Sequence, residues 1–102
     1  MFIIDVADTM RLQESKVEFD SLLGDEQLQS APVLILGNKI DKAEAVSEDF
    51  IRQHFGLYGL TTGKDATSSE DLGRRPIELF MVSVLKRQGY GEGFRWLSNF
   101  IN

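Results

Sequence analysis

The sequence of 102 residues contains no cysteine, which excludes both a disulfide framework and attachment of a lipid through a cysteine. It has no apolar run long enough to span a membrane and no signal peptide. An excess of positive charge is also missing, because 16 acidic residues outnumber 11 basic ones and give a net charge of −5. Nucleic-acid surfaces and polybasic membrane anchors are basic. We therefore expect no nucleic-acid partner, no membrane anchor in this chain and a cytoplasmic location.

What is present is a pattern of apolar strands that alternate with helices. Hydrophobic residues make up 42% of the chain, enough for the packed core of one small domain. Strands are predicted at 2–6, 33–36 and 77–82, and helices at about 9–23, from Ser47 to Phe55, and at 91–101. Asp8 and Ser47 are the predicted N-caps of the first two helices. Alternation of this kind predicts an α/β fold with a parallel sheet and right-handed crossovers.

The most informative motif is Asn38-Lys39-Ile40-Asp41, which directly follows the second predicted strand. One carboxylate, that of Asp41, can accept both adjacent donors of a guanine ring, N1–H and the N2 amine. The Asn38 amide can bond the ring edge, and the methylene stem of Lys39 can cover one face of the base. Adenine lacks the donor pair and would leave Asp41 desolvated and unpaired. The alternative interpretation is an ordinary polar loop capped by Asn and Asp.

Longer segments strengthen the first interpretation. Residues 2–8, 34–41 and 80–97 together resemble the Arf/Sar branch of the Ras-like small GTPases, and residues 55–64 resemble the Sar type. The resemblance implies a P-loop NTPase-like (Ras-like) parallel sheet with flanking helices, truncated here to three strands and three helices. Residues 1–102 would then be the C-terminal part of one small GTPase domain.

The resemblance also implies a second group of site residues. In such GTPases a serine after the last strand supports the base-binding Asp, a role that falls on Ser83. A backbone N–H just after it, here that of Val84 or Leu85, faces guanine O6. An ordinary strand end is the alternative interpretation of these three residues.

The implied function is a GTP-dependent switch in COPII vesicle budding from the endoplasmic reticulum, acting at the surface of that membrane and at the Golgi. Its ligands would be GTP or GDP, with Mg²⁺ in the complete domain, and its partners coat and regulatory proteins. This chain contains no Gly-x-x-x-x-Gly-Lys-Ser/Thr motif, since Thr62-Gly63-Lys64 follows no apolar strand. Phosphoryl transfer needs groups that hold the phosphates and the metal. We therefore expect base recognition but no GTP hydrolysis by this chain alone, and we assign it no catalytic or metal-binding residue.

A different class of function remains open, a non-catalytic interaction or oligomerisation module derived from a Ras-like half-domain. The strand at 2–6 is expected at an open sheet edge, through which the chain could form a homo-oligomer. Apolar surface around Phe94, Trp96 and Phe100 is expected to be uncovered. In the polar segment 56–75, we expect Tyr58 and Leu60 to pack against the fold and residues 65–70 to be mobile.

Overall fold

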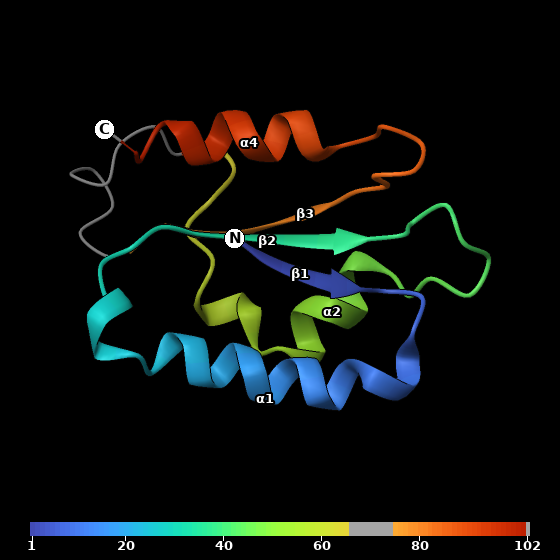
Figure 1. Ribbon diagram of the computed structural model, residues 1–102, viewed down its shortest axis with the longest axis horizontal. Coiled ribbons are helices and arrows are strands. Elements are labelled where there is room, and N and C mark those ends of the chain that lie inside the picture. Colours follow the sequence, from blue (N-terminus) through green and yellow to red (C-terminus); the bar gives the residue numbers. More distant parts are fainter. Residues whose placement is uncertain (66–74, 102) are drawn as a thin grey trace.

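The computed structural model describes residues 1–65 and 75–101. Its sheet has three parallel strands in the order β1 (Phe2–Asp5), β2 (Val33–Asn38) and β3 (Ile77–Met81). The described α-helices are α1 (Leu12–Leu23), α2 (Glu48–His54) and α4 (Tyr90–Ser98), and three short 3-10 turns lie at Thr9–Arg11, Glu26–Leu28 and Leu57–Gly59. Helices α1 and α2 cover one face of the sheet and α4 covers the other (Figure 1). The predicted α/β fold with a parallel sheet is confirmed.

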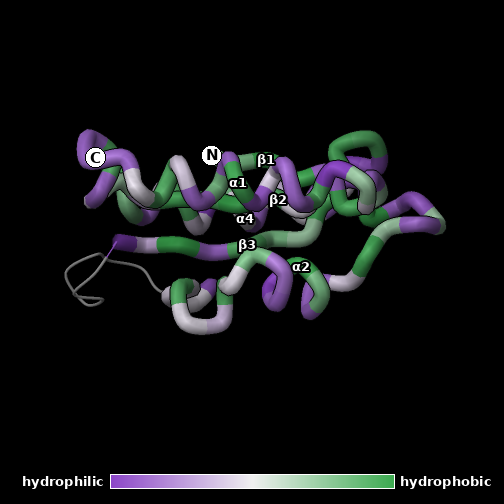
Figure 2. The backbone as a smooth tube through the Cα atoms, turned by 90° about the horizontal axis from the view of Figure 1, so that it is seen from below, coloured by the Kyte–Doolittle hydropathy of each residue, from purple (hydrophilic) through white to green (hydrophobic). Residues whose placement is uncertain are grey.

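β2 and β3 bury side chains on both faces, because helices cover the sheet on both sides. Ile35 of β2 belongs to the larger core, which also contains Phe19 of α1 and Phe55 after α2. Its neighbour Leu34 faces the other way and packs in a smaller core with Trp96 of α4. The helices alternate between hydrophilic and hydrophobic residues along their length (Figure 2), as expected for elements with one buried face.

The two predicted helix starts turned out differently. Ser47 caps α2 as predicted, since its Oγ accepts a hydrogen bond from the Phe50 N–H at 3.1 Å. Asp8 makes no side-chain capping bond, and the chain first forms the 3-10 turn Thr9–Arg11 before α1 begins at Leu12. The carboxylate of Asp8 instead lies 3.6 Å from the Arg11 guanidinium, so the prediction for Asp8 was wrong.

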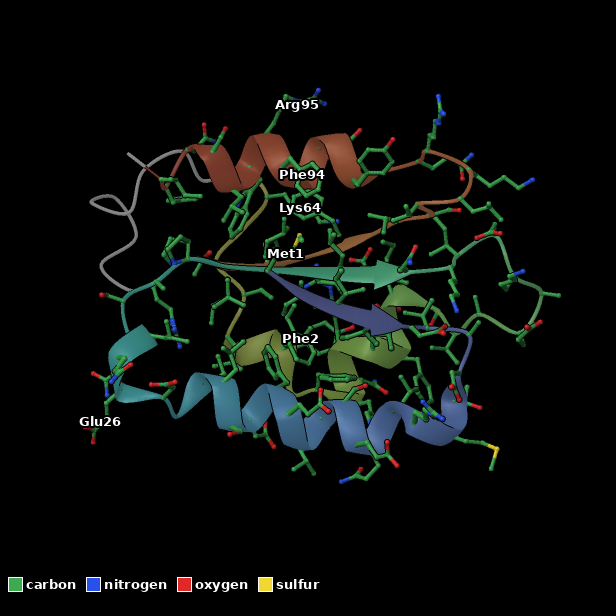
Figure 3. All side chains as sticks on the ribbon, viewed as in Figure 1. Met1, Phe2, Glu26, Lys64, Phe94 and Arg95 are labelled. Carbon is green, nitrogen blue, oxygen red and sulfur yellow. The ribbon has the colours of Figure 1, made fainter. Side chains whose placement is uncertain are left out.

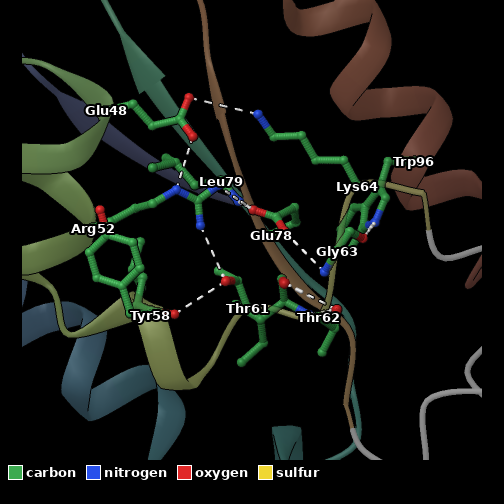
Figure 4. A network of polar contacts seen from close by, with 12 residues as sticks. Glu48, Arg52, Tyr58, Thr61, Thr62, Gly63, Lys64, Glu78, Leu79 and Trp96 are labelled. Atoms are coloured by element: carbon green, nitrogen blue, oxygen red, sulfur yellow. Dashed lines mark hydrogen bonds and ion pairs between the residues drawn. The ribbon is translucent and has the colours of Figure 1, made fainter.

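The outer edge of β3 is covered by residues 61–64. The Thr62 N–H donates to the Ile77 carbonyl at 2.9 Å, and the Gly63 N–H donates to Glu78 Oε1 at 3.1 Å. Glu78 is buried and also pairs with Arg52 of α2, Nη2 to Oε2 at 2.8 Å (Figure 4). Within the described part of the chain, β1 is therefore the edge strand that has no backbone partner on its outer side, and its Ile3 is 55% exposed.

The same segment corrects the prediction for Trp96. This side chain is only 3% exposed, because its Nε1–H donates to the Gly63 carbonyl at 3.1 Å and its ring packs against Phe80 and Phe100. Figure 3 shows Lys64 on the α4 side of the sheet and Phe2 pointing toward α1. Phe94, at 45% exposed, fits the expectation of uncovered surface, whereas Trp96 does not.

The prediction that Tyr58 packs against the fold was also wrong. Its side chain is 59% exposed, and its hydroxyl donates to Asp49 Oδ1 at 2.8 Å. This bond is the main cause that raises the pKa of Tyr58. Leu60 is partly buried, as expected. The mobility expected at 65–70 concerns residues that, from 66 onward, lie outside the described part of the chain.

Candidate functional site

Two loops meet at the carboxyl ends of β2 and β3, which emerge at the same end of the sheet (Figure 1). Parallel strands present such loops at one edge, where α/β sheets bind ligands. The first loop contains Asn38 to Asp41 and the second contains Ser83 to Lys86. Backbone bonds extend the strand pairing into them, since the Ile40 N–H donates to the Val82 carbonyl at 3.2 Å. The sheet therefore brings together the two groups of residues predicted from the sequence.

Asp41 and Ser83 are joined directly. The Ser83 hydroxyl donates to Asp41 Oδ1 at 2.8 Å and its oxygen accepts the Lys86 N–H at 3.0 Å. Ser83 is fully buried, whereas Asp41 is exposed. The hydrogen bond from Ser83 is the main cause that lowers the pKa of Asp41, and the charges of Lys42 and Lys86 add to it. Asp41 therefore presents an ionised, accessible carboxylate, and the hydrogen bond from the buried Ser83 hydroxyl fixes its orientation.

Asn38 links the same two loops through one oxygen. Its Oδ1 accepts the Lys39 N–H at 2.8 Å and the Val84 N–H at 3.0 Å. Among the described residues no hydrogen bond uses the Asn38 Nδ2 group, which leaves this donor for a ligand. The Val84 N–H is already bonded to Asn38 Oδ1. Of the two predicted backbone donors, the Leu85 N–H is therefore the one that has no partner among the described residues and can donate to a ligand. Both residues are exposed, Val84 at 54% and Leu85 at 73%.

The second loop is shaped by backbone features that the sequence analysis did not use. Ser83 and Gln88 exchange backbone hydrogen bonds, with the Ser83 N–H donating at 3.0 Å and the Gln88 N–H at 2.9 Å. Gly89 follows with φ of 83°, and a Cβ atom there would lie 2.5 Å from the Met81 carbonyl oxygen. Only glycine fits such a position. Gly89 thus allows the tight turn that returns the chain beneath Ser83.

Lys39 reaches a residue that sequence reasoning missed. Its backbone has φ of 77°, and its ammonium group lies 2.7 Å from Oδ2 of Asp5, the last residue of β1. A signal was present in the sequence, because Asp5 comes at the end of an apolar strand, as Asn38 does. A polar side chain thus lies at or just after the carboxyl end of each of the three parallel strands.

The described residues contain no group of three His, Cys, Asp or Glu side chains that could hold a metal ion. In the same part of the chain, no helix has the length and apolar character needed to cross a membrane.

Comparison with known proteins assigns the chain to a family. The model of the ADP-ribosylation factor family, Arf, matches residues 1–101. The chain belongs to this family. The small COPII coat GTPase SAR1 of Giardia intestinalis is 41% identical over 101 residues, which cover 99% of this chain and 52% of that protein. SAR1 of Nicotiana tabacum is 35% identical over 108 residues, 99% of this chain and 54% of that protein.

A third relative is less similar over a comparable length. ADP-ribosylation factor 1 of Brassica rapa is 29% identical over 99 residues, which cover 97% of this chain and 48% of that protein. The chain thus spans about half the length of these curated relatives, since the matched region covers 48% to 54% of each. The predicted resemblance to the Arf/Sar branch is confirmed, and the β1–β3 sheet is consistent with a truncated Ras-like domain of this family.

Proposed function

We propose that Asn38, Lys39, Asp41, Ser83, Val84 and Leu85 form the guanine-recognition site of a Sar-type small GTPase. One observation supports this proposal above the others, the pair of cross-loop bonds in which Ser83 holds Asp41 and Asn38 holds the Val84 N–H. Neither bond is needed for a plain polar loop, and together they orient the Asp41 carboxylate and the Asn38 amide.

The chemistry of recognition follows from which groups remain available. The Asp41 carboxylate accepts guanine N1–H and the N2 amine. The Asn38 Nδ2 group donates to the ring edge, and the Leu85 N–H donates to O6. Val84 acts indirectly, because its N–H orients the Asn38 amide. Adenine offers an acceptor at N1 and a donor at C6, so it would face Asp41 and Leu85 with mismatched groups, which is strongly unfavourable in a desolvated site.

The wider role proposed for the parent protein is a GTP-dependent switch in COPII coat assembly at the endoplasmic reticulum membrane surface, with transport to the Golgi. The names of the two SAR1 relatives support it. In this proposal residues 1–102 are the C-terminal part of one GTPase domain. Phosphates and Mg²⁺ are held by groups outside the motifs of this chain, so this part recognises the base without hydrolysing GTP. Coat and regulatory proteins are its proposed partners.

The second hypothesis, a non-catalytic interaction module, gains no support from the comparisons, which return GTPases and ADP-ribosylation factors. Self-association remains a prediction, because the described residues leave the outer side of β1 without a partner strand. Self-association through β1 would also be compatible with the first hypothesis.

Binding of purine monophosphates tests the proposal. A base pocket without phosphate contacts is expected to bind at about the millimolar level, near −4 kcal/mol, which saturation-transfer NMR can measure. GMP should bind more tightly than IMP, which lacks the N2 amine, and IMP more tightly than AMP. Asp41→Ala should remove the ranking, whereas Asp20→Asn, a change on α1, should preserve it. Equal binding of GMP and AMP by the unaltered chain would contradict the proposed function.

A further inference from the structure

The ion pair between Lys39 and Asp5 connects two strands at the candidate site. Asp5 is the register partner of Asn38, so its carboxylate lies beside the loop that begins there. The Lys39 Nζ to Asp5 Oδ2 distance is 2.7 Å, and the two side chains are 48% and 37% exposed. The contact joins residues 34 positions apart, and it therefore depends on the parallel pairing of β1 with β2.

Asp5 is itself held in place. Its second carboxylate oxygen, Oδ1, accepts the Ala7 N–H at 3.0 Å, so one oxygen closes the turn after β1 and the other receives the ammonium group. Partial burial raises the pKa of Asp5, but the hydrogen bonds from Lys39 and Ala7 outweigh it and the net pKa lies below the ordinary value. The same contact raises the pKa of Lys39. Both groups remain charged at neutral pH.

The backbone of Lys39 is also fixed. Its φ of 77° is unusual for a residue other than glycine, and it is held by the N–H bond to Asn38 Oδ1 and by the Lys42 N–H, which donates to the Lys39 carbonyl at 3.1 Å. A lysine side chain anchored at its backbone and at its ammonium group has few rotamers left, which reduces what is lost when a ligand packs on it. The stem between the two anchors is then a preformed apolar surface.

We propose that Asp5 is a positioning residue for base recognition, acting through Lys39. It holds the lysine stem extended beside the Asn38–Asp41 loop, where the stem covers one face of the purine. This inference rests on the proposed guanine site. It assigns a role to β1, a strand that contributes no residue to the Asn-Lys-x-Asp motif.

A double-mutant cycle tests this role with GMP as the probe, followed by NMR titration of the whole chain. Asp5→Asn keeps an oxygen for the Ala7 N–H but removes the charge, and Lys39→Met keeps a stem without the ammonium group. We expect Asp5→Asn to weaken GMP binding by about two- to fivefold, the range for an exposed ion pair. The same change should have no further effect in the Lys39→Met background.

A purely electrostatic effect of Asp5→Asn on GMP affinity would have the opposite sign. GMP is an anion, so removing the negative charge of Asp5 would strengthen its binding. Titrations with inorganic phosphate, which carries negative charge without a base, measure that charge effect separately. The matched control is Asp20→Asn, which removes the carboxylate of another exposed pair, Lys16–Asp20 at 2.8 Å, away from the site. We expect it to leave GMP binding unchanged.

A spectroscopic readout separates positioning from a purely structural role. The ¹³Cε shift of Lys39 should titrate at a lower pH in Asp5→Asn than in the unaltered chain, because the carboxylate that raises its pKa is gone. Asp5→Ser, which keeps an acceptor for the Ala7 N–H, provides a second variant if Asp5→Asn folds poorly.

The outcomes distinguish the two proposals. Equal binding of GMP and AMP by the unaltered chain would overturn the guanine site and this inference with it. A clear preference for GMP that is unaffected by Asp5→Asn would overturn the role of Asp5 alone. Equal weakening by Asp5→Asn with and without Lys39→Met would do the same, since Asp5 would then act on the fold rather than through Lys39.

Discussion

Single polar atoms decide what the candidate site can recognise. The Asp41 carboxylate is a double acceptor fixed by Ser83, and the Asn38 amide has its oxygen engaged and its nitrogen available. This division of donors and acceptors matches the edge of guanine. It also means that replacing one atom should change the base that is preferred, rather than only weaken binding.

Asp41→Asn is expected to shift preference from guanine to xanthine. The new amide offers a donor where guanine also has the N2 donors, whereas xanthine has a carbonyl at that position. Competition between GMP and XMP measures the change, and an increase in relative XMP affinity of about tenfold, or 1.4 kcal/mol, is expected for one exchanged hydrogen bond. Asp20→Asn on α1 is the control. An unchanged ratio would show that Asp41 does not contact the base.

The pH dependence of the site follows from the lowered pKa of Asp41. A carboxyl group whose pKa is lower in the folded state contributes stability above its unfolded pKa and loses it as the pH falls through the folded value. Because guanine recognition needs the ionised carboxylate, the preference for GMP over AMP should be constant from pH 7 to 5 and fall only at pH values below the ordinary pKa of an aspartate. In Ser83→Ala the ¹³Cγ titration of Asp41 should move to higher pH, because the hydrogen bond to the carboxylate is lost. A midpoint that stays the same would exclude Ser83 as the cause.

At the scale of elements, the segment 61–64 covers the outer edge of β3. Residues 61–64 run along this strand from the α2 side to the α4 side, and polar contacts hold them. Arg52 donates to Thr61 Oγ1 at 3.2 Å and pairs with Glu78, while the Gly63 carbonyl receives the Trp96 Nε1–H. Burial alone would lower the pKa of Arg52, but the hydrogen bonds to Glu78 and Glu48 outweigh it, so the guanidinium stays charged.

Glu78→Gln should destabilise the chain markedly. Glu78 is 3% exposed, and removing its charge leaves the partly buried Arg52 without its main partner. A loss of about 3 kcal/mol in the free energy of unfolding is expected for a broken buried pair. Urea unfolding at pH 7 measures it, with the exposed Glu44→Gln as control, for which a change within about 0.5 kcal/mol is expected. A small loss for Glu78→Gln would mean that water replaces the carboxylate at this edge.

Much of this architecture is predictable from the sequence, and three of the exceptions share one physical origin. The strands, the α2 cap at Ser47 and the meeting of Asn38–Asp41 with Ser83–Leu85 follow from local apolar runs and the rules of parallel sheets. The burial of Trp96, the choice of the Leu85 N–H over that of Val84, and the pair of Asp5 with Lys39 were not predicted. Each depends on contacts between segments distant in sequence, which periodicity and propensity do not encode.

At the scale of the whole molecule, the sheet formed by the described residues has one covered edge and one edge at which they supply no partner. By the alternation of a parallel ladder, the N–H of Val6 points to β2, which directs the N–H and carbonyl of Ile3 outward. The exposed side chains of Met1 and Ile3 lie at the same edge, at 65% and 55%. Uncovered strand edges with apolar side chains favour pairing with another chain.

We therefore predict that the 102-residue chain forms a dimer or higher oligomer through β1. Sedimentation equilibrium at several protein concentrations measures its mass. Ile3→Lys, which places a charge on the edge strand, should reduce the oligomer to monomer or lower the folded fraction. Val17→Lys replaces an equally exposed apolar residue on α1, 61% exposed, and should leave the mass unchanged. A folded monomer at all concentrations would show that the open edge does not drive association.

Guanine recognition, as proposed, needs the loops after β2 and β3 to act together. Residue-resolved ¹H–¹⁵N NMR during parallel titrations with GMP and AMP tests it most directly. We expect saturable shifts with GMP at residues 38–41 and 83–86, with the Leu85 amide shifting strongly because it donates to O6, and no matching shifts with AMP. Shifts that are the same for both nucleotides, or that occur away from these two loops, would contradict it.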